Sequence, residues 1–148
     1  MKKLGWFLLN LLIYLAIVAL IVWGLPQFLS WKLGTRYPIA AITSGSMWPV
    51  LKEDDIVLIK KIPKEEIKVG DIVVWTNNKG FTIHRVVKLE ADTLTTKGDA
   101  NFANDPPVKY EEIVGRTVYW RDSKPLRIPY FGYIAFIAGK LRGGQKQI

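Results

Sequence analysis

The chain contains no cysteine and only one histidine, His84, among its 148 residues. The absence of cysteine excludes disulfide bonds, thiolate nucleophiles and cysteine metal sites. A single histidine likewise excludes a metal centre built from several imidazoles. We therefore expect no metal and no cofactor, and catalytic groups are sought among hydroxyls, carboxylates, lysines and one imidazole.

Charge is also missing from one region, since no Asp, Glu, Lys or Arg occurs between Leu4 and Trp31. The whole chain nevertheless carries a formal charge of +8. Its basic residues are scattered as pairs and singles rather than gathered in one dense stretch. This pattern does not favour nucleic-acid binding and is more typical of solvated surfaces attracted to anionic lipid.

The uncharged run over residues 4–31 predicts a transmembrane helix, because about 20 apolar residues suffice to cross a bilayer. Trp6 lies near one end and Trp23 and Trp31 near the other, where interfacial aromatic residues are expected. Pro26 predicts the end of the helix. We assign residues 1–31 to a membrane anchor.

This segment is interpreted as an uncleaved signal anchor rather than a removed signal peptide. Its apolar stretch exceeds the usual h-region of about 7–15 residues, and no clear A-x-A cleavage site follows it. Lys2 and Lys3 favour a cytoplasmic N-terminus, which places the chain after about residue 30 on the outer face. Lys32 and Arg36 favour the opposite orientation.

Beyond the anchor the pattern changes to short segments rich in Val, Ile, Thr and aromatic residues, separated by Gly, Pro and Asn. Asn78-Lys79-Gly80 between two such segments suits a hairpin loop. We predict a small, mostly antiparallel β-domain over residues 32–127, with strands in the segments YPIAAIT, DIVLIKKI, GDIVVWT, FTIHRVVKL, DTLTTKG and IVGRTVYW.

Residues 128–148 differ again, with about 11 apolar residues followed by a basic end. This run is too short to span a bilayer comfortably, and the start of a second crossing is the alternative to the helix predicted next. We predict a short interfacial or packed C-terminal helix with a basic tail.

The segment TSGSMWPVL places two serines, Ser44 and Ser46, around one glycine. A serine hydroxyl needs a base to become a nucleophile, and a histidine oriented by a carboxylate serves this role. His84 follows Ser46 by 38 residues, and Asp99 and Asp105 lie in a Gly- and Asn-rich stretch after it. By residue type alone, Ser-Gly-Ser is more often a turn than a catalytic element, and a lone histidine in a strand is more often structural or exposed than catalytic.

TSGSMWPVL resembles the serine segment of the type I signal peptidases. Three further segments follow in that family's order: DIVLIKK, then VGDIVVWT with IHRVV, then TTKGDANFAND. The resemblance covers residues of about 4–138, including the anchor. His84 stands where bacterial-type members have a lysine, as in the archaeal, endoplasmic-reticulum and some sporulating-bacterial members.

The resemblance implies a role for each matching residue. Ser46 resembles the nucleophile and His84 the general base, while Ser44 resembles the oxyanion-hole hydroxyl that works with the backbone N–H of Ser46. Asp105 resembles the aspartate that orients the base. Asp99 resembles the second required carboxylate, with a structural or electrostatic role, and the resemblance favours Asp105 over Asp99 for the triad.

Two neighbours of the serine, Met47 and Trp48, are expected to contact substrate, and Trp48 is alternatively expected to contact lipid. Ala100 departs from the family pattern, because many relatives have asparagine there. This departure puts one loop hydrogen bond in doubt but no catalytic atom.

The resemblance implies a membrane-bound serine endopeptidase that removes signal peptides from secreted preproteins at the outer membrane surface. Its expected partners are preproteins, the bilayer and either other membrane subunits or the secretion translocon. Its expected location is the cell membrane or the endoplasmic-reticulum membrane, crossed once. A protease dedicated to one or a few substrates and a non-catalytic anchored β-domain remain alternatives, as does a lysine base drawn from Lys60, Lys61, Lys88 and Lys97.

Overall fold

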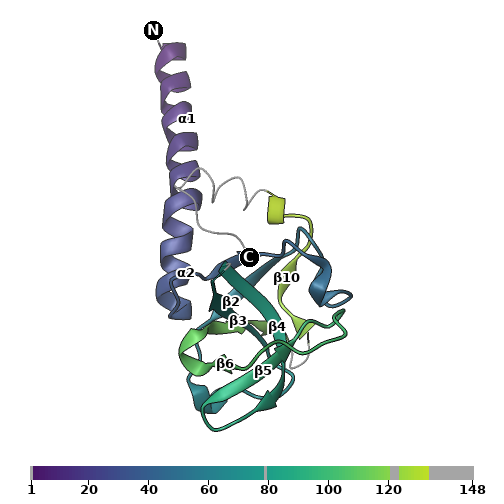
Figure 1. Cartoon of the computed structure of the whole chain (residues 1–148). Coiled ribbons are helices and arrows are strands. Elements are labelled where there is room, and N and C mark those ends of the chain that lie inside the picture. Colours follow the sequence, from purple (N-terminus) through teal and green to yellow (C-terminus); the bar gives the residue numbers. More distant parts are fainter. Residues whose placement is uncertain (1, 79, 121–123, 134–148) are drawn as a thin grey trace.

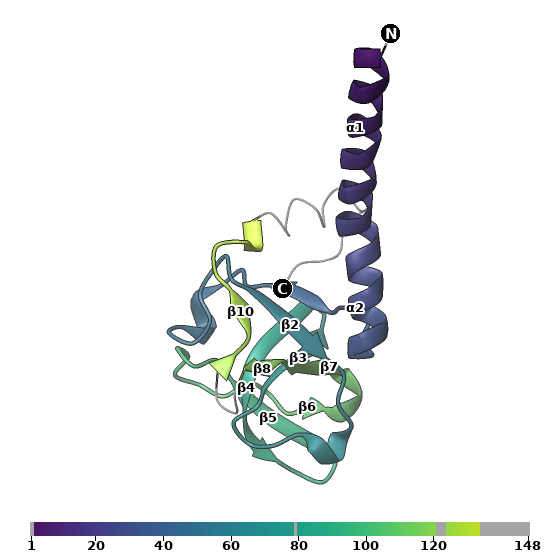
Figure 2. The ribbon, with the colours of Figure 1, turned by 180° about the vertical axis from the view of Figure 1, so that it is seen from behind.

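One long apolar helix and one β-domain make up the computed structural model, which describes residues 2–78, 80–120 and 124–133. The helix comprises α1 (Lys2–Ala19), the π-helical turn η1 (Leu20–Gly24) and α2 (Leu25–Leu33). Residues Lys3–Leu33 form a segment long and apolar enough to cross a membrane, and its central residues are not buried by the protein. In both Figure 1 and Figure 2, α2 lies beside the β-domain and α1 extends away from it.

The predicted helix end at Pro26 is wrong, because the helix continues to Leu33. Pro26 falls in the first turn of α2, directly after the π-helical turn. Proline is tolerated in a first turn, where its missing N–H removes no required bond. The helix ends instead at Gly34, whose φ of 66° is the left-handed conformation typical of a helix C-terminus.

An antiparallel sheet dominates the domain, as predicted. Its spatial order is β1-β2-β7-β3-β4-β5-β6, with β10 also paired to β2, and β8 and β9 form a separate pair among the described residues. The strands are β1 (Ile39–Ala41), β2 (Ile56–Lys60), β3 (Ile72–Asn77), β4 (Gly80–Leu89), β5 (Thr93–Lys97), β6 (Val108–Lys109), β7 (Ile113–Thr117), β8 (Tyr119–Trp120), β9 (Lys124–Pro125) and β10 (Arg127–Ile128).

The hairpin predicted around Asn78 is present, since Asn77 at the end of β3 pairs with Gly80 at the start of β4. Alternation along the strands sends side chains to opposite sheet faces. Ile72 and Val74 therefore join one buried cluster and Val73 joins another. This central hairpin fixes the register of the strand that carries His84.

Short 3₁₀ turns connect several strands: η2 (Gly45–Met47), η3 (Lys64–Glu66) and η4 (Tyr110–Glu112). The chain then returns to β2 through β10, with Arg127 paired to Val57. Gly132 donates its N–H to the Asp54 carbonyl at 2.7 Å. Most of the predicted C-terminal helix falls on residues 134–148, which lie outside the described part of the chain.

Candidate active site

Ser46 lies in η2, the turn that follows β1. The turn is closed by hydrogen bonds from Trp48 N–H to the Gly45 carbonyl and from Leu51 N–H to the Met47 carbonyl, both at 3.0 Å. Met47 is 1% exposed and belongs to the buried cluster. Because its neighbour is fixed in the core, the Ser46 side chain has a defined direction.

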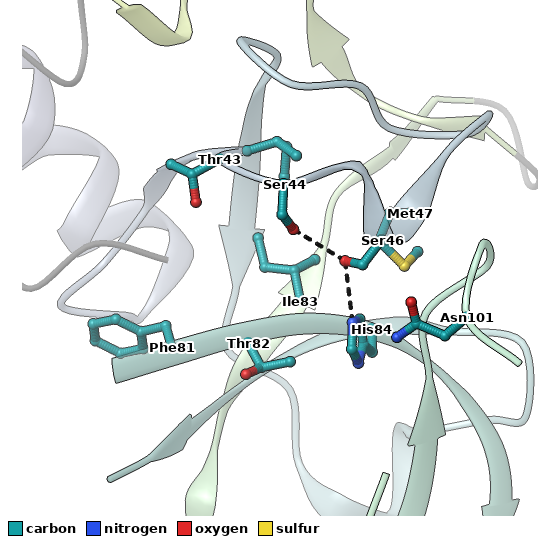
Figure 3. A pocket seen from close by; sticks show the side chains of 10 residues that line it. Thr43, Ser44, Ser46, Met47, Phe81, Thr82, Ile83, His84 and Asn101 are labelled. Atoms are coloured by element: carbon teal, nitrogen blue, oxygen red, sulfur yellow. Dashed lines mark hydrogen bonds between the residues drawn. The ribbon is translucent and has the colours of Figure 1, made fainter. Parts of the chain in front are cut away.

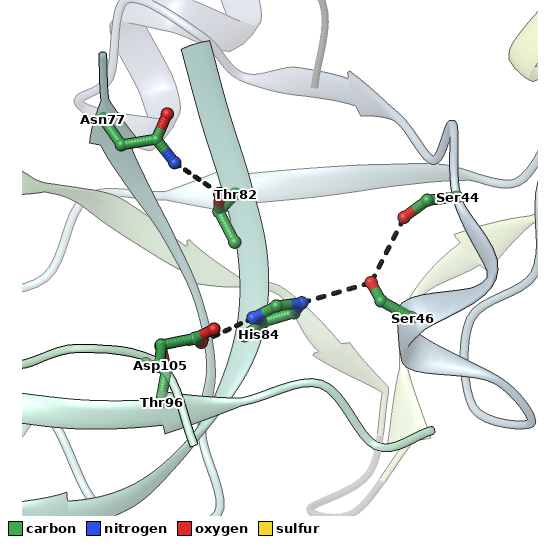
Figure 4. Close-up of polar contacts among 7 residues, drawn as sticks. All are labelled: Ser44, Ser46, Asn77, Thr82, His84, Thr96 and Asp105. Carbon is green, nitrogen blue, oxygen red and sulfur yellow. Dashed lines mark hydrogen bonds and ion pairs between the residues drawn. The ribbon is translucent and has the colours of Figure 1, made fainter. Parts of the chain in front are cut away.

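His84 reaches this serine from β4, where it pairs with Val73 of β3. It is 7% exposed. Its Nε2 lies 3.2 Å from Ser46 Oγ and its Nδ1 lies 2.6 Å from Asp105 Oδ2 (Figure 4). With Nδ1 as the donor to the carboxylate, Nε2 is left as an acceptor for the serine proton. Serine, imidazole and carboxylate thus form one hydrogen-bonded chain.

Asp105 lies in the loop after β5 and is hydrogen-bonded to Thr96 of that strand. Its backbone N–H donates to the Thr96 carbonyl at 2.8 Å, and the Thr96 hydroxyl donates to its Oδ2 at 2.6 Å. The carboxylate therefore accepts two hydrogen bonds on the oxygen that faces His84. Both distances are typical of strong bonds to a charged acceptor.

Asp99 has different partners. Its two oxygens accept hydrogen bonds from Nε and Nη2 of Arg85, each at 2.7 Å, and Arg85 also donates to the Gly70 carbonyl at 2.8 Å. The hydrogen bond to this carboxylate raises the pKa of the Arg85 guanidinium against the lowering effect of burial. The ion pair connects the strand residue next to His84 with the loop that leads to Asp105.

Ser44 lies beside the nucleophile candidate, with 3.2 Å between its Oγ and Ser46 Oγ. The two hydroxyls open onto a cleft of about 240 Å³. Its lining comprises Ile42, Thr43, Ser44, Ser46, Met47, Phe81, Thr82, Ile83, His84 and Asn101 (Figure 3). The cleft combines an apolar floor with hydroxyl, imidazole and amide groups.

The two residues expected to contact substrate are separated by the structure. Met47 lines the cleft from the core. Trp48 is 59% exposed and is not part of the cleft lining. Trp48 is therefore an exposed residue beside the turn, and only Met47 of the pair lines the cleft.

The lysines considered as alternative bases lie elsewhere. Lys60, Lys61 and Lys88 are exposed, and Lys88 pairs with Glu90 at 2.7 Å. Lys97 of β5 lies opposite Arg85 of β4 in the strand register. The cleft lining contains no lysine within the described ranges. The same part of the chain also holds no group of three or more residues suited to a metal ion.

Residues 25–118 match the protein family described as Peptidase S24-like. The signal peptidase complex catalytic subunit SEC11 of Lachancea thermotolerans is 35% identical, with 72% of each chain covered. The corresponding subunit of Sclerotinia sclerotiorum is 34% identical over 68% of this chain and 63% of that protein. That of Lodderomyces elongisporus is 32% identical over 74% of each.

This chain belongs to the type I signal peptidases. The family predicted from the four ordered sequence segments is confirmed, including its endoplasmic-reticulum-type branch, since the relatives are SEC11 subunits. The mostly antiparallel β-domain behind an apolar helix agrees with this membership.

The sequence pattern does not predict two polar contacts of this signal peptidase. The sequence predicts Thr96 only as part of a strand, although its hydroxyl contacts Asp105. The sequence pattern gives Arg85 no role of its own, although it binds Asp99 at both oxygens. The available sequence signal for the first contact is the spacing of Thr96 two residues after Leu94, which places both on the same face of a short strand.

Proposed function

We propose that the chain is a membrane-bound serine endopeptidase that removes N-terminal signal peptides from secreted preproteins. One observation carries the proposal: Ser46 Oγ, the His84 ring and Asp105 Oδ2 form a continuous chain with separations of 3.2 and 2.6 Å. Similarity to catalytic subunits of signal peptidase complexes supports the choice of substrate.

In the proposed reaction, Ser46 Oγ attacks the scissile carbonyl carbon while its proton passes to His84 Nε2. Asp105 holds the proton on Nδ1 and stabilises the imidazolium that forms. The Ser44 hydroxyl, together with the Ser46 backbone N–H, donates to the developing oxyanion. The imidazolium then protonates the leaving amine, and water, deprotonated by His84, releases the acyl group from Ser46.

The membrane anchor gives this chemistry a location. The helix ends at Leu33, and Ser46 follows it by 13 positions (46 − 33) through Gly34 and β1, so the cleft stays near the membrane surface. We place the N-terminus in the cytoplasm and the β-domain on the outer or lumenal face, in the cell membrane or the endoplasmic-reticulum membrane. Because the relatives are subunits of complexes, assembly with other membrane proteins is part of the proposal.

The test is cleavage of purified preproteins by the full chain in detergent micelles, with cut sites mapped by mass spectrometry. Ser46→Ala and His84→Ala should each lower kcat by several orders of magnitude, since members of a triad act as a unit. Ser30→Ala makes the same serine-to-alanine change in α2 and should retain full activity.

Three results would contradict the proposal. Unchanged processing by Ser46→Ala would refute serine catalysis. Retained activity in His84→Ala, with loss of activity in Lys97→Ala, would indicate that the base is a lysine and not His84. Cuts scattered along the preprotein, rather than one cut after the signal peptide, would refute the substrate class.

A further inference from the structure

We propose that Thr96 is a positioning residue, whose buried hydroxyl holds the Asp105 carboxylate in line with His84. The inference rests on the proposed function, because it assigns a role within the same Ser46–His84–Asp105 chain. Figure 4 places Thr96 and Asp105 together on the side of His84 away from Ser46.

The first argument is the geometry of the contact. Thr96 binds Asp105 at two points: its hydroxyl donates to Oδ2 at 2.6 Å and its carbonyl accepts the Asp105 backbone N–H at 2.8 Å. Oδ2 is also the oxygen that lies 2.6 Å from His84 Nδ1. A short O–H···O⁻ bond of this kind is among the stronger hydrogen bonds in proteins. The hydroxyl therefore limits rotation of the carboxylate and selects which oxygen faces the ring.

The second argument is burial. Thr96 is 0% exposed and follows Leu94, also 0% exposed, in the inward alternation of β5. A position of this kind accepts valine, which has the shape of threonine and no hydroxyl to desolvate. Burying a hydroxyl is unfavourable unless it is hydrogen-bonded. Here the hydroxyl is satisfied by Asp105, so the contact accounts for a polar atom at a core position.

The strand register explains why this position faces the site. Thr96 lies opposite Val86 in the β4–β5 pair, and Val86 is two residues after His84 on the same strand face. Thr96 and His84 are therefore diagonal neighbours on one side of the sheet. Asp105, folded back over β5, sits between them and contacts both.

The consequence concerns the histidine tautomer. A neutral imidazole carries its proton on the nitrogen whose partner accepts it. With Oδ2 fixed opposite Nδ1, the proton stays there and Nε2 remains free to take the Ser46 proton. Without the Thr96 hydroxyl, Asp105 Oδ2 loses one of the two hydrogen bonds that it accepts. The tautomer with the proton on His84 Nδ1 is then populated less.

The experiment compares Thr96→Val, which removes the hydroxyl at nearly constant shape, with Thr96→Ser, which retains it. We expect kcat to fall about 10- to 100-fold in Thr96→Val, as for loss of a hydrogen bond to a charged group, with KM little changed. Thr96→Ser should recover most of the rate. Thr96→Ala replaces Thr96→Val if the latter does not fold.

Thr117 supplies a matched control. It is 1% exposed in β7, and its hydroxyl has no hydrogen-bond partner among the described residues. Thr117→Val makes the same chemical change at an equally buried strand position outside the cleft lining. It should leave kcat unchanged, which separates loss of a hydroxyl contact from general disturbance of the core.

Two further readouts distinguish positioning from mere stability. In an Asp105→Ala background, Thr96→Val should have little additional effect on kcat, because the group through which it acts is gone. The chain has one histidine, so ¹⁵N-histidine NMR reports His84 without overlap. The proton should lie on Nδ1 in the native chain and in Thr96→Ser, and be shared between both nitrogens in Thr96→Val.

The inference is overturned if Thr96→Val retains kcat within about threefold of the native chain. It is also overturned if Thr96→Val lowers kcat equally in the native and Asp105→Ala backgrounds, or leaves the tautomer unchanged. These outcomes are distinct from failure of the proposed function, in which Ser46→Ala itself would process preproteins at the native rate.

Discussion

Gly98 directly follows β5, and an added methyl group there would meet the backbone carbonyl of Ser46. An ideal Cβ at Gly98 would lie 2.7 Å from the Ser46 carbonyl oxygen and 2.7 Å from Asn101 Nδ2. The φ of Gly98 is not in the left-handed region, so alanine would meet no backbone restriction. The effect of Gly98→Ala is therefore steric and directed at Ser46.

Its magnitude follows from the distances. Ordinary contact begins near 3.4 Å, so the Ser46 backbone or the β5 end must move by about 0.7 Å. The Ala100 N–H that binds the Ser46 carbonyl at 2.8 Å moves with it. A misplacement of about 1 Å lowers rates about 100-fold. We expect kcat to fall about 30- to 100-fold, with a loss of unfolding free energy of about 1–3 kcal/mol from overpacking.

The assay is steady-state cleavage of a preprotein in micelles, paired with thermal unfolding. Gly5→Ala is the control, because an added Cβ there meets nothing within 4 Å. A Gly98→Ala enzyme with kcat within about threefold of the native chain would refute the steric argument. So would a rate loss confined to temperatures at which the variant is already unfolded.

Three further predictions concern single contacts. Ser44→Ala should lower kcat about 100-fold with little change in KM, measured by the same cleavage assay. Arg127→Ala leaves the Asp55 carboxylate, 2% exposed, without the guanidinium 2.7 Å away and should lower the unfolding free energy by about 3 kcal/mol in denaturant titrations. The hydrogen bond from Lys88 lowers the pKa of Glu90, so this contact stabilises the fold above the usual glutamate pKa and is lost as pH falls through the lowered value. Lys88→Ala should raise the pKa of Glu90 in a carboxyl-carbon NMR titration, and an unchanged titration would contradict the ion pair.

Local sequence pattern predicts most of the longer strands and the apolar helix. Segments rich in Val, Ile, Thr and aromatic residues, separated by Gly, Pro and Asn, predict β1, β2, β3, β4, β5 and β7, because these residue types favour strands. The uncharged run predicted the apolar helix. The predicted end of this helix at Pro26 is wrong, because local rules do not anticipate the π-helical turn before it. The two-residue strand β10 was also missed, since its pairing with β2 depends on residues about 70 positions apart.

For the candidate site, too, the sequence predicts which residues matter, and the fold gives the distances between them. Ordered segments identified Ser46, His84 and two aspartates as the residues to examine, but 38 residues separate the serine from the histidine and chain spacing gives no distance. The fold places Asp105 2.6 Å from the imidazole and Asp99 against Arg85. The choice between the two carboxylates as partner of His84 is therefore a geometric one.

The sequence by itself determined that the chain has a long apolar helix, a β-rich domain and the family's ordered segments, because composition and periodicity are properties of neighbouring residues. The resemblance favoured Asp105, but only the tertiary structure brings its carboxylate to His84 and decides where Thr96 directs its hydroxyl and how closely Gly98 approaches Ser46. Those relations depend on strand register and on loops folded back over the sheet. They arise from contacts between residues that are distant in the chain, which short-range sequence pattern does not predict.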